Sequence, residues 1–216
     1  MTTVVEGERC NGRATLFDQL AHEWERRDPQ GTRPAICLLD GERALWDMRA
    51  VFWENTVGIL DIFHVLQRLW RVATCVHGEE TPEAGAYVTE QLRTLLEGQV
   101  DTVIRRLGQL PQVHGLRGPK RQVVREVQGY LRNNRAHMRY DEYLAAGYPI
   151  GSGVAEGACR HLVKDRLEQT GMRWSLEGAQ AMLHVRATYL NGEWSDFIAY
   201  RIGVEQKRLY GRYAAA

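Results

Sequence analysis

Three acidic residues and one histidine of this 216-residue chain stand where they could serve phosphodiester chemistry. Asp40 and Asp61 each follow a short apolar run, His64 comes three residues after Asp61, and Glu156 follows a glycine-rich stretch. Carboxylates at strand ends, joined by one from a helix, bind Mg²⁺ and leave places for water and phosphate oxygens. Two such ions about 4 Å apart can activate a water or a 3′-hydroxyl and stabilise the leaving oxygen.

Each of these residues also has a plainer structural interpretation. Asp40-Gly41 has the composition of a simple turn. Asp61 suits a helix N-cap beside which His64 is incidental. Glu156 suits the first turn of a helix, where a negative charge is favourable with the helix dipole. The residue types alone leave both interpretations open.

The elements that would position these residues follow from hydrophobic periodicity. The runs 34–39 and 57–60 are too short for buried helices and predict buried parallel strands, each ending at an aspartate. Helical spacing predicts helices over 14–27, 42–53 and 63–76. Such a β-α-β-α order predicts a right-handed crossover, which brings Asp40 and Asp61 to the same carboxyl edge of one sheet.

Beyond residue 76 the strand signals disappear and helices dominate. Four helices are predicted within an all-α insertion over 77–146, at 82–97, 99–110, 118–134 and 138–146, with Pro111 among the separators. A punctuated loop over 147–153 then opens a long helix, with Ser152 as its N-cap and Gly171 as its stop. Two last helices are expected at 176–190 and 196–210, and residues 1–13 carry no periodic pattern.

Long stretches of the chain resemble bacterial insertion-sequence transposases of the ISKra-four family. The resemblance covers nearly everything from about residue 20 to 210. Its most specific segments are RRDPQGTRPAICLLDG (26–41), ILDIFHVLQRLW (59–70), NNRAHMRYDEYLAAGYPIGSGVAEGACRHLVKDRLEQTGMRW (133–174) and EGAQAMLHVRATYLNGEW (177–194).

The resemblance implies a DDE transposase with an RNase H-like core, which cleaves and transfers DNA strands with Mg²⁺ or Mn²⁺. Asp40 in LLDG matches the second aspartate of that pattern, and Glu156 in GVAEGACR matches the closing glutamate, so these two are the implied metal ligands. Asp61 and His64 match an Asp-x-x-His signature, taken as an accessory catalytic element. The implied partners are transposon-end and target DNA, with a second copy or a full-length transposase as a possible protein partner.

The first aspartate of the pattern is not found. In an RNase H-like sheet two antiparallel strands and a helix separate the first two aspartates, which requires roughly 50 residues. Asp40 and Asp61 are far closer in the chain, and neither Asp18 nor Asp28 ends a predicted strand. We therefore expect an N-terminally truncated copy with a partial RNase H-like core over 14–76 and 147–190, the all-α insertion over 77–146, and a C-terminal helix and tail over 191–216. Such a chain is expected to be inactive alone.

Basic residues supply candidate DNA contacts. Arg160 and Lys164 follow Glu156 at i+4 and i+8, on one helical face, and suit phosphates beside the scissile bond. Arg121 and Arg125 belong to a basic group in the insertion, for which a solvated helix face is the competing interpretation.

The hydrophobic composition bears on where the protein is located, and two alternative functions stay open beside the transposase. No apolar run approaches the roughly 20 residues of a membrane span, which favours a cytoplasmic protein without a membrane partner. The resemblance further implies a bacterial, nucleoid-associated location. Two other functions remain open. The chain could be a non-catalytic DNA-binding or interfering relic, or a small complete nuclease that uses Asp40, Asp61 and Glu156.

Overall fold

The computed structural model describes the backbone of residues 2–5 and 8–210, and the side chains of residues 12–210. The chain divides into two compact units, Met1–Ser152 and Gly153–Ala216. The described part is rich in helices and contains one small parallel sheet, which agrees with the helix-rich α/β class expected from the sequence.

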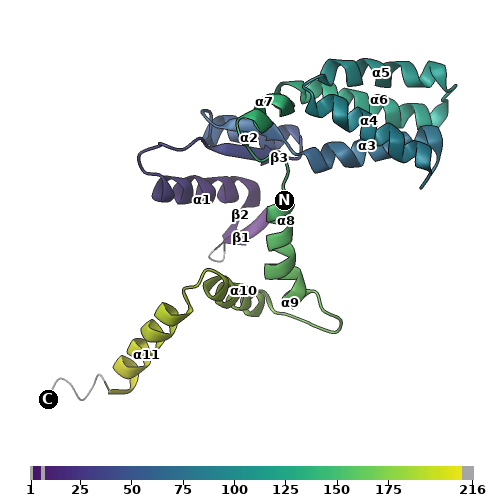
Figure 1. Cartoon of the computed structure of the whole chain (residues 1–216). Coiled ribbons are helices and arrows are strands. Elements are labelled where there is room, and N and C mark those ends of the chain that lie inside the picture. The colour runs from purple at the N-terminus through teal and green to yellow at the C-terminus, as the bar shows by residue number, and fades with distance from the viewer. Residues whose placement is uncertain (1, 6–7, 211–216) are drawn as a thin grey trace. The chain divides into compact units, whose positions relative to one another are not determined.

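The parallel sheet of the first unit consists of β3 (Ile36–Leu39) and β4 (Val57–Leu60), joined by α2 (Arg43–Phe52) (Figure 1). The register pairs Leu39 with Leu60, so the two strands end level with each other. Both strands were predicted, and their ends agree with the apolar runs. A short strand with one polar residue at its end is what a buried parallel pair requires.

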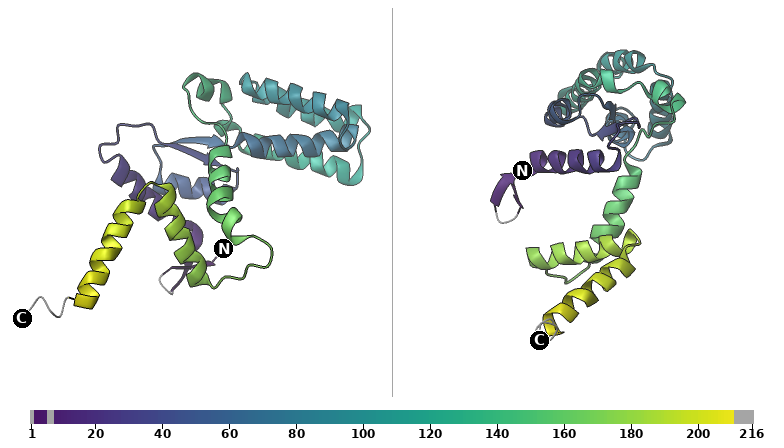
Figure 2. Two further views of the ribbon diagram at one scale, coloured as in Figure 1. Left: turned by 60° about the horizontal axis from the view of Figure 1, so that its bottom comes forward. Right: turned by 90° about the vertical axis from the view of Figure 1, so that its left-hand side faces the viewer.

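Four helices pack side by side into an antiparallel bundle, as the views of Figures 1 and 2 agree: α3 (Ile62–His77), α4 (Pro82–Leu96), α5 (Val100–Val113) and α6 (Gly118–Asn133). Local chemistry fixes their ends. Asp61 caps α3, and Thr81 caps α4 by accepting a hydrogen bond from the Ala84 amide, with Pro82 in the first turn.

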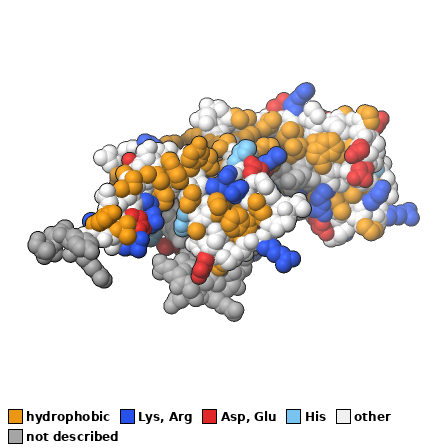
Figure 3. Space-filling model, turned by 90° about the horizontal axis from the view of Figure 1, so that it is seen from below, with side chains coloured by type: hydrophobic (Ala, Val, Ile, Leu, Met, Phe, Trp, Pro, Cys, Tyr) orange, Lys and Arg blue, Asp and Glu red, His pale blue; other side chains and the backbone are white. Residues whose placement is uncertain are grey.

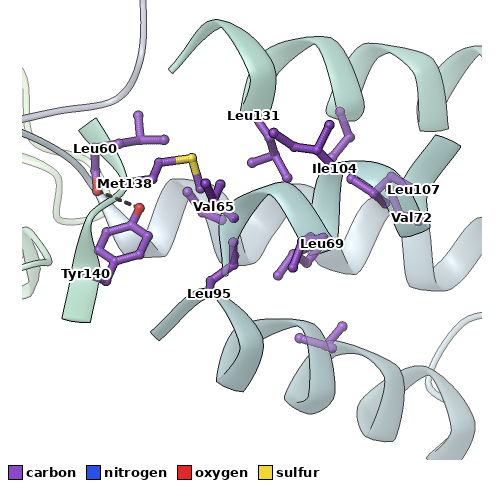
Figure 4. Packing of buried hydrophobic residues seen from close by; sticks show 14 of the residues in the cluster. Leu60, Val65, Leu69, Val72, Leu95, Ile104, Leu107, Leu131, Met138 and Tyr140 are labelled. Atoms are coloured by element: carbon purple, nitrogen blue, oxygen red, sulfur yellow. Dashed lines mark hydrogen bonds between the residues drawn. The ribbon is translucent and has the colours of Figure 1, made fainter. Parts of the chain in front are cut away.

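The hydrophobic core lies inside this bundle and continues onto β4. Val65, Leu69 and Val72 of α3 are fully buried among residues of the other three helices, and Leu60 of β4 joins the same cluster (Figure 4). Helix α3 therefore contributes to the sheet edge and to the bundle at once. The helices of segment 77–146 pack against α3 within one unit, so they position the sheet.

The edge of β4 that faces away from β3 is covered by side chains. After α6 come η1, a 3₁₀ turn (Arg135–His137), and the short helix α7 (Tyr140–Ala145). The buried Tyr140 hydroxyl donates to the Leu60 carbonyl at 2.9 Å, as Figure 4 shows. Tyr143 donates to the Gly58 carbonyl at 3.4 Å, and the His137 Nδ1 lies 3.2 Å from the same oxygen. Backbone acceptors that no strand satisfies thus receive hydrogen bonds from side chains.

The structure corrects two expectations about local structure, one in the N-terminal segment and one at Pro111. Residues 1–13 were expected to be irregular, but β1 (Thr2–Val5) and β2 (Glu8–Asn11) pair antiparallel, and α1 (Gly12–Arg27) begins directly afterwards. Backbone pairing needs no hydrophobic period, so no periodic pattern in the sequence indicated these strands. Pro111 was expected to separate helices, but it lies inside α5. The helix ends two residues later at Val113, so the hydrogen bond that proline cannot donate is lost only in the last turn.

The second unit consists of helices alone. A continuous helical stretch contains α8 (Gly153–Cys159), the π-helical segment η2 (Arg160–Lys164) and α9 (Asp165–Leu167). Helices α10 (Leu176–Leu190) and α11 (Trp194–Tyr210) follow. None of the described residues of these helices is buried. Large apolar side chains on α10 and α11 are exposed (orange in Figure 3); they include Leu176, Tyr189, Leu190, Tyr200 and Ile202.

Two expectations from the sequence are not tested by this architecture. The described residues contain a two-stranded parallel sheet, whereas an RNase H-like core has more strands, so the RNase H-like assignment stays a prediction. The grouping of 14–76 with 147–190 into one catalytic core stays a prediction.

The tyrosines that cover β4 give a first testable prediction. Tyr140→Phe leaves the buried Leu60 carbonyl without its donor and should lower the free energy of unfolding by about 1–3 kcal/mol in urea titrations. Tyr143→Phe is the matched control: its bond to Gly58 is longer and His137 also contacts that oxygen, so a smaller loss is expected. Equal losses for the two variants would contradict this account of the strand edge.

A second prediction concerns the pH dependence of stability. Burial lowers the pKa of His137 below its ordinary value of 6.5, and the hydrogen bond to Gly58 only partly opposes this. The folded state therefore keeps the ring neutral at a pH where the unfolded chain already binds a proton. The neutral His137 ring makes its full contribution to the stability of the folded state above pH 6.5, and this contribution is lost as the pH falls below that value. Urea unfolding of the His137→Asn variant should show a shallower loss of stability on acidification than the parent; an equally steep loss would refute this.

Candidate functional site

Asp40 and Asp61 occupy the same carboxyl edge of the β3–β4 pair. Each is the first residue after its strand, and the Asp61 amide donates to the Leu39 carbonyl at 2.9 Å. The aspartates therefore follow directly after the paired residues Leu39 and Leu60. This is the edge at which parallel α/β sheets gather ligands and catalytic groups.

Asp40 stands in a tight turn and keeps one carboxylate oxygen available. Its Oδ1 accepts a hydrogen bond from the Glu42 amide at 2.8 Å, and no described residue donates to Oδ2. Gly41 adopts a φ of 86°, and a Cβ there would lie 2.8 Å from Leu60 and Tyr130 side-chain atoms. Only glycine fits this turn. The turn interpretation of Asp-Gly is thus confirmed, and it leaves Asp40 half-buried with an oxygen that could bind a cation.

Asp61 is 2% exposed and has hydrogen-bonding partners on both carboxylate oxygens. Oδ1 accepts from the Phe63 amide at 2.9 Å, which caps α3 as the plainer interpretation expected. The Ser152 amide also lies 3.4 Å from Oδ1. The Ser152 hydroxyl donates to Oδ2, and the His64 Nδ1 lies 3.2 Å from Oδ2. A carboxylate engaged in this way orients its neighbours and has little capacity left for a metal ion.

The same contacts fasten the loop that precedes α8. The Ile62 amide donates to the Ile150 carbonyl at 2.9 Å, next to the Ser152–Asp61 contact. Gly151 lies against the Phe63 ring so closely that a Cβ would be 2.8 Å from a ring carbon. The stretch Gly147–Ser152 of the GYPIGSG motif is therefore held on the junction between β4 and α3 by backbone, hydroxyl and ring contacts.

Two residues near this edge were missed by the sequence analysis. Tyr130 of α6 donates its hydroxyl to the Asp40 carbonyl at 2.7 Å. Burial raises the pKa of Tyr130, which the Arg68 contact opposes only in part, so the phenol remains a donor. The Arg68 guanidinium lies 3.7 Å from the centroid of the Tyr130 ring, and its buried Nε has no hydrogen-bond partner among the described residues. One signal was available: Arg68 follows His64 by four residues, which is same-face spacing on a helix.

Glu156 belongs to the second unit, in the first turn of α8, where its charge is favourable with the helix dipole. Its side chain is exposed and lines a hollow of about 990 Å³ together with Arg160 and Lys164. Asp165 and Glu168 line the same hollow, so its charge is mixed rather than uniformly basic.

The helix that carries Arg160 and Lys164 is not regular. Residues 160–164 form a π-helical turn, and the Arg186 guanidinium donates to the carbonyls of Leu162 at 3.1 Å and His161 at 2.5 Å. Single π-turns inside α-helices are frequent at functional sites. The strict i+4 and i+8 spacing assumed from the sequence is changed by this turn, although all three side chains line one hollow.

The basic group of the insertion divides into paired and unpaired side chains. Arg135 forms an ion pair with Asp101 at 2.5 Å, and Arg139 forms one with Glu142 at 2.9 Å. Arg121 and Arg125 on α6 are exposed and have no ion pair within the described ranges. These two arginines therefore remain available to an external anion.

The metal-binding capacity of the described residues is limited within each unit. No cluster of three or more histidine, cysteine or acidic side chains that could hold a metal ion is found among residues 12–210. At the sheet edge, Asp40 is the residue with an oxygen to offer.

No protein-family model, curated protein or solved structure matches this chain. Among the helices that the structure describes, none combines the length and apolar character needed to cross a membrane. What the chain does is therefore inferred from its own residues and contacts.

The docked loop gives a third prediction. Ser152→Ala removes the hydroxyl donor to Asp61 and should release the loop locally, because hydrogen bonds to charged groups contribute about 1.5–3 kcal/mol. Hydrogen exchange of the Ile62 amide, which donates to Ile150, should then accelerate by roughly 10- to 100-fold in NMR measurements. Ser175→Ala is the matched control, since Ser175 caps α10 instead and should leave Ile62 exchange unchanged. Unchanged exchange in Ser152→Ala would contradict the role of this contact.

Proposed function

We propose that this chain is the C-terminal part of the catalytic core of a DDE transposase resembling the ISKra-four family, with an RNase H-like arrangement around β3 and β4. Asp40 and Glu156 are its metal ligands, and Asp61 with His64 is an accessory element that organises the site. The observation that carries the proposal is the fastening of Ile150 and Ser152 at the carboxyl edge where Asp40 lies. That loop leads directly to the helix with Glu156.

The length of the connecting chain supports a shared site. Glu156 lies four positions after Ser152. Even a fully extended chain of four residues spans at most about 14 Å, and a helix spans less than half of that. With Ser152 tied to Asp61, a glutamate at position 156 can serve the edge that carries Asp40.

The residues suit Mg²⁺ or Mn²⁺. Asp40 offers an oxygen without a protein partner, and a carboxylate at position 156 offers a second ligand from a helix, leaving places for waters and phosphate oxygens. When bound, the metal activates the attacking water or 3′-hydroxyl and stabilises the leaving oxygen. Asp40 and Glu156 hold it, while Asp61 keeps the loop and His64 in place. Arg160 and Lys164 bind DNA phosphates beside the scissile bond.

The third carboxylate of a DDE site would arrive on another strand. Ile36 and Leu38 of β3 point their backbone groups away from β4, and no hydrogen bond to these groups is found in the described part of the chain. This open edge suits a strand that pairs with β3 and ends in an acidic residue beside Asp40. We therefore expect the chain alone to bind DNA without cleaving it.

The same observations favour one second candidate, a non-catalytic DNA-binding subunit that associates with a full-length transposase or with a second copy. The open edge of β3 and the exposed apolar side chains of α10 and α11 are surfaces of the kind that a protein partner covers. The proposal that Asp61 completes a small nuclease is disfavoured by the partners on both of its oxygens.

Paramagnetic Mn²⁺ tests the shared metal site. In the parent chain Mn²⁺ should broaden the NMR signals of the Gly41 and Gly157 amides, the neighbours of the two ligands. Asp40→Asn should abolish the broadening at both positions, because one ion contacts both carboxylates. Asp47→Asn, an exposed aspartate on α2, is the control and should change neither. Broadening at Gly157 that survives Asp40→Asn would overturn the proposal.

A plasmid assay separates the rival functions. With Mg²⁺ or Mn²⁺ the purified chain should bind supercoiled DNA and nick it no faster than the Asp40→Asn variant does. Efficient nicking that is lost in Glu156→Gln and in Asp61→Asn would instead establish the complete nuclease. Absence of DNA binding at low salt would count against every transposase-related function.

A further inference from the structure

A groove of about 680 Å³ runs between α2 and α6 and begins beside the carboxylate edge. We propose that this groove binds the sugar-phosphate backbone of the DNA strand that leads away from Asp40. This inference rests on the proposed function and deepens it by assigning a path for the strand. The residues that line the groove are Gly41, Arg43 and Trp46 from the first strand–helix segment, and Arg125, Glu126, Gly129, Tyr130, Asn133, Asn134 and His137 from α6 and η1.

The groove is continuous with the candidate catalytic edge. Gly41, its first residue, is the neighbour of Asp40. Tyr130 lines the groove and donates its hydroxyl to the Asp40 carbonyl. A polymer held in the groove therefore passes within one residue of the carboxylate proposed to bind metal.

The balance of available charge in the groove is positive. Arg125 is exposed and unpaired among the described residues, and Arg43 has only a distant partner, Asp47 at 4.0 Å. The one acid of the lining, Glu126, lies 3.4 Å from Arg71 and accepts a hydrogen bond from Gln122 at 3.2 Å. The two arginines lie on opposite walls, and the negative charge of Glu126 is compensated by Arg71. This arrangement suits successive phosphates of one strand.

The polar groups of the walls are already oriented by contacts within the protein. The Trp46 and His137 rings stack with centroids 3.8 Å apart, and the Trp46 Nε1 donates to Asn134 at 2.7 Å. His137 uses Nδ1 on the Gly58 carbonyl, which leaves Nε2 as its other polar atom. A preorganised wall of this kind lowers the entropic cost of binding.

The floor of the groove is open at one residue of α6. Arg125, Gly129 and Asn133 follow at four-residue intervals and share one face of the helix. A Cβ at Gly129 would meet no heavy atom within 4 Å, although glycine inside a helix costs roughly 1 kcal/mol relative to alanine. The helix therefore accepts a side chain there, and the open space belongs to the groove rather than to the packing.

Position 129 allows a test that fills the groove without removing a protein contact. The probe is a short fluorescent DNA duplex of arbitrary sequence, measured by anisotropy across a salt titration. Arg125→Ala should weaken binding by about tenfold at low salt and reduce the salt slope by about one unit. Gly129→Glu should weaken it at least as much, since it places a negative charge in the strand path. Gly129→Ala should keep parental binding and be slightly more stable to urea.

Matched variants distinguish the groove from the rest of the proposal. Arg105→Ala removes an exposed arginine from α5, outside the groove, and should leave affinity and salt slope unchanged. If the parent binds DNA but Arg125→Ala and Gly129→Glu bind equally well, the groove assignment is overturned while the transposase proposal stands. If the parent chain itself binds no duplex, both fail. Urea unfolding of every variant separates lost binding from lost folding.

Discussion

The buried carboxylate of Asp61 joins the parts on which the proposed site depends. It ends β4, caps α3 through the Phe63 amide, and receives the Ser152 hydroxyl from a loop 91 residues further along the chain. A charged group at 2% exposure is tolerated only when hydrogen bonds replace its lost hydration. Because these donors come from two separate segments, docking of the loop supplies hydrogen bonds that the buried carboxylate would otherwise lack. The hydrogen-bonding requirement of one side chain thus fastens the end of the first unit at Ser152.

Side-chain donors perform a second task, at the edge of the sheet. A two-stranded parallel sheet is too small to satisfy its own backbone, and β4 would present unpaired carbonyls on the side away from β3. Tyr140, Tyr143 and His137 cover that side from the segment that follows the bundle. The helical segment 77–146 is therefore necessary to the sheet in physical terms. It supplies the core for α3 and also returns the chain to β4 with the donors that the strand needs.

The sequence predicted the elements well and their contacts poorly. The strands were found because a short apolar run followed by an aspartate has few other solutions, and the bundle helices because their apolar residues recur at helical spacing. Pro111 was misplaced because a proline in the last turn of a helix looks the same in sequence as one that separates helices. Ser152 was expected as the N-cap of the helix that follows it, and the structure shows that its hydroxyl also donates to Asp61, a partner that no local pattern identifies.

The difference between predicting elements and predicting their contacts also explains which candidate site residues could be identified from the sequence. Asp40 and Asp61 could be paired from the sequence because strand order and register follow from the β-α-β connection. Tyr130 could not, since it reaches the edge from α6, and the spacing of Arg68 from His64 indicates a shared helix face but not its contact with Tyr130, which depends on how α3 and α6 pack. Glu156 was chosen on the resemblance, and Arg160 and Lys164 on their α-helical spacing from it; the π-turn at 160–164 alters that spacing without a compositional signal.

The two kinds of β-strand edge in the parallel sheet have different consequences for function. The carbonyls on the outer edge of β4 are satisfied by side chains of the same unit. The outer edge of β3 has no such donors among the described residues, and its backbone groups at Ile36 and Leu38 are oriented to pair. A strand added there would end beside Asp40, because the carboxyl edge of β3 is where Asp40 stands. Under the proposed function, pairing of that edge would also bring an acidic residue to Asp40, so that assembly and completion of the site would be one structural event.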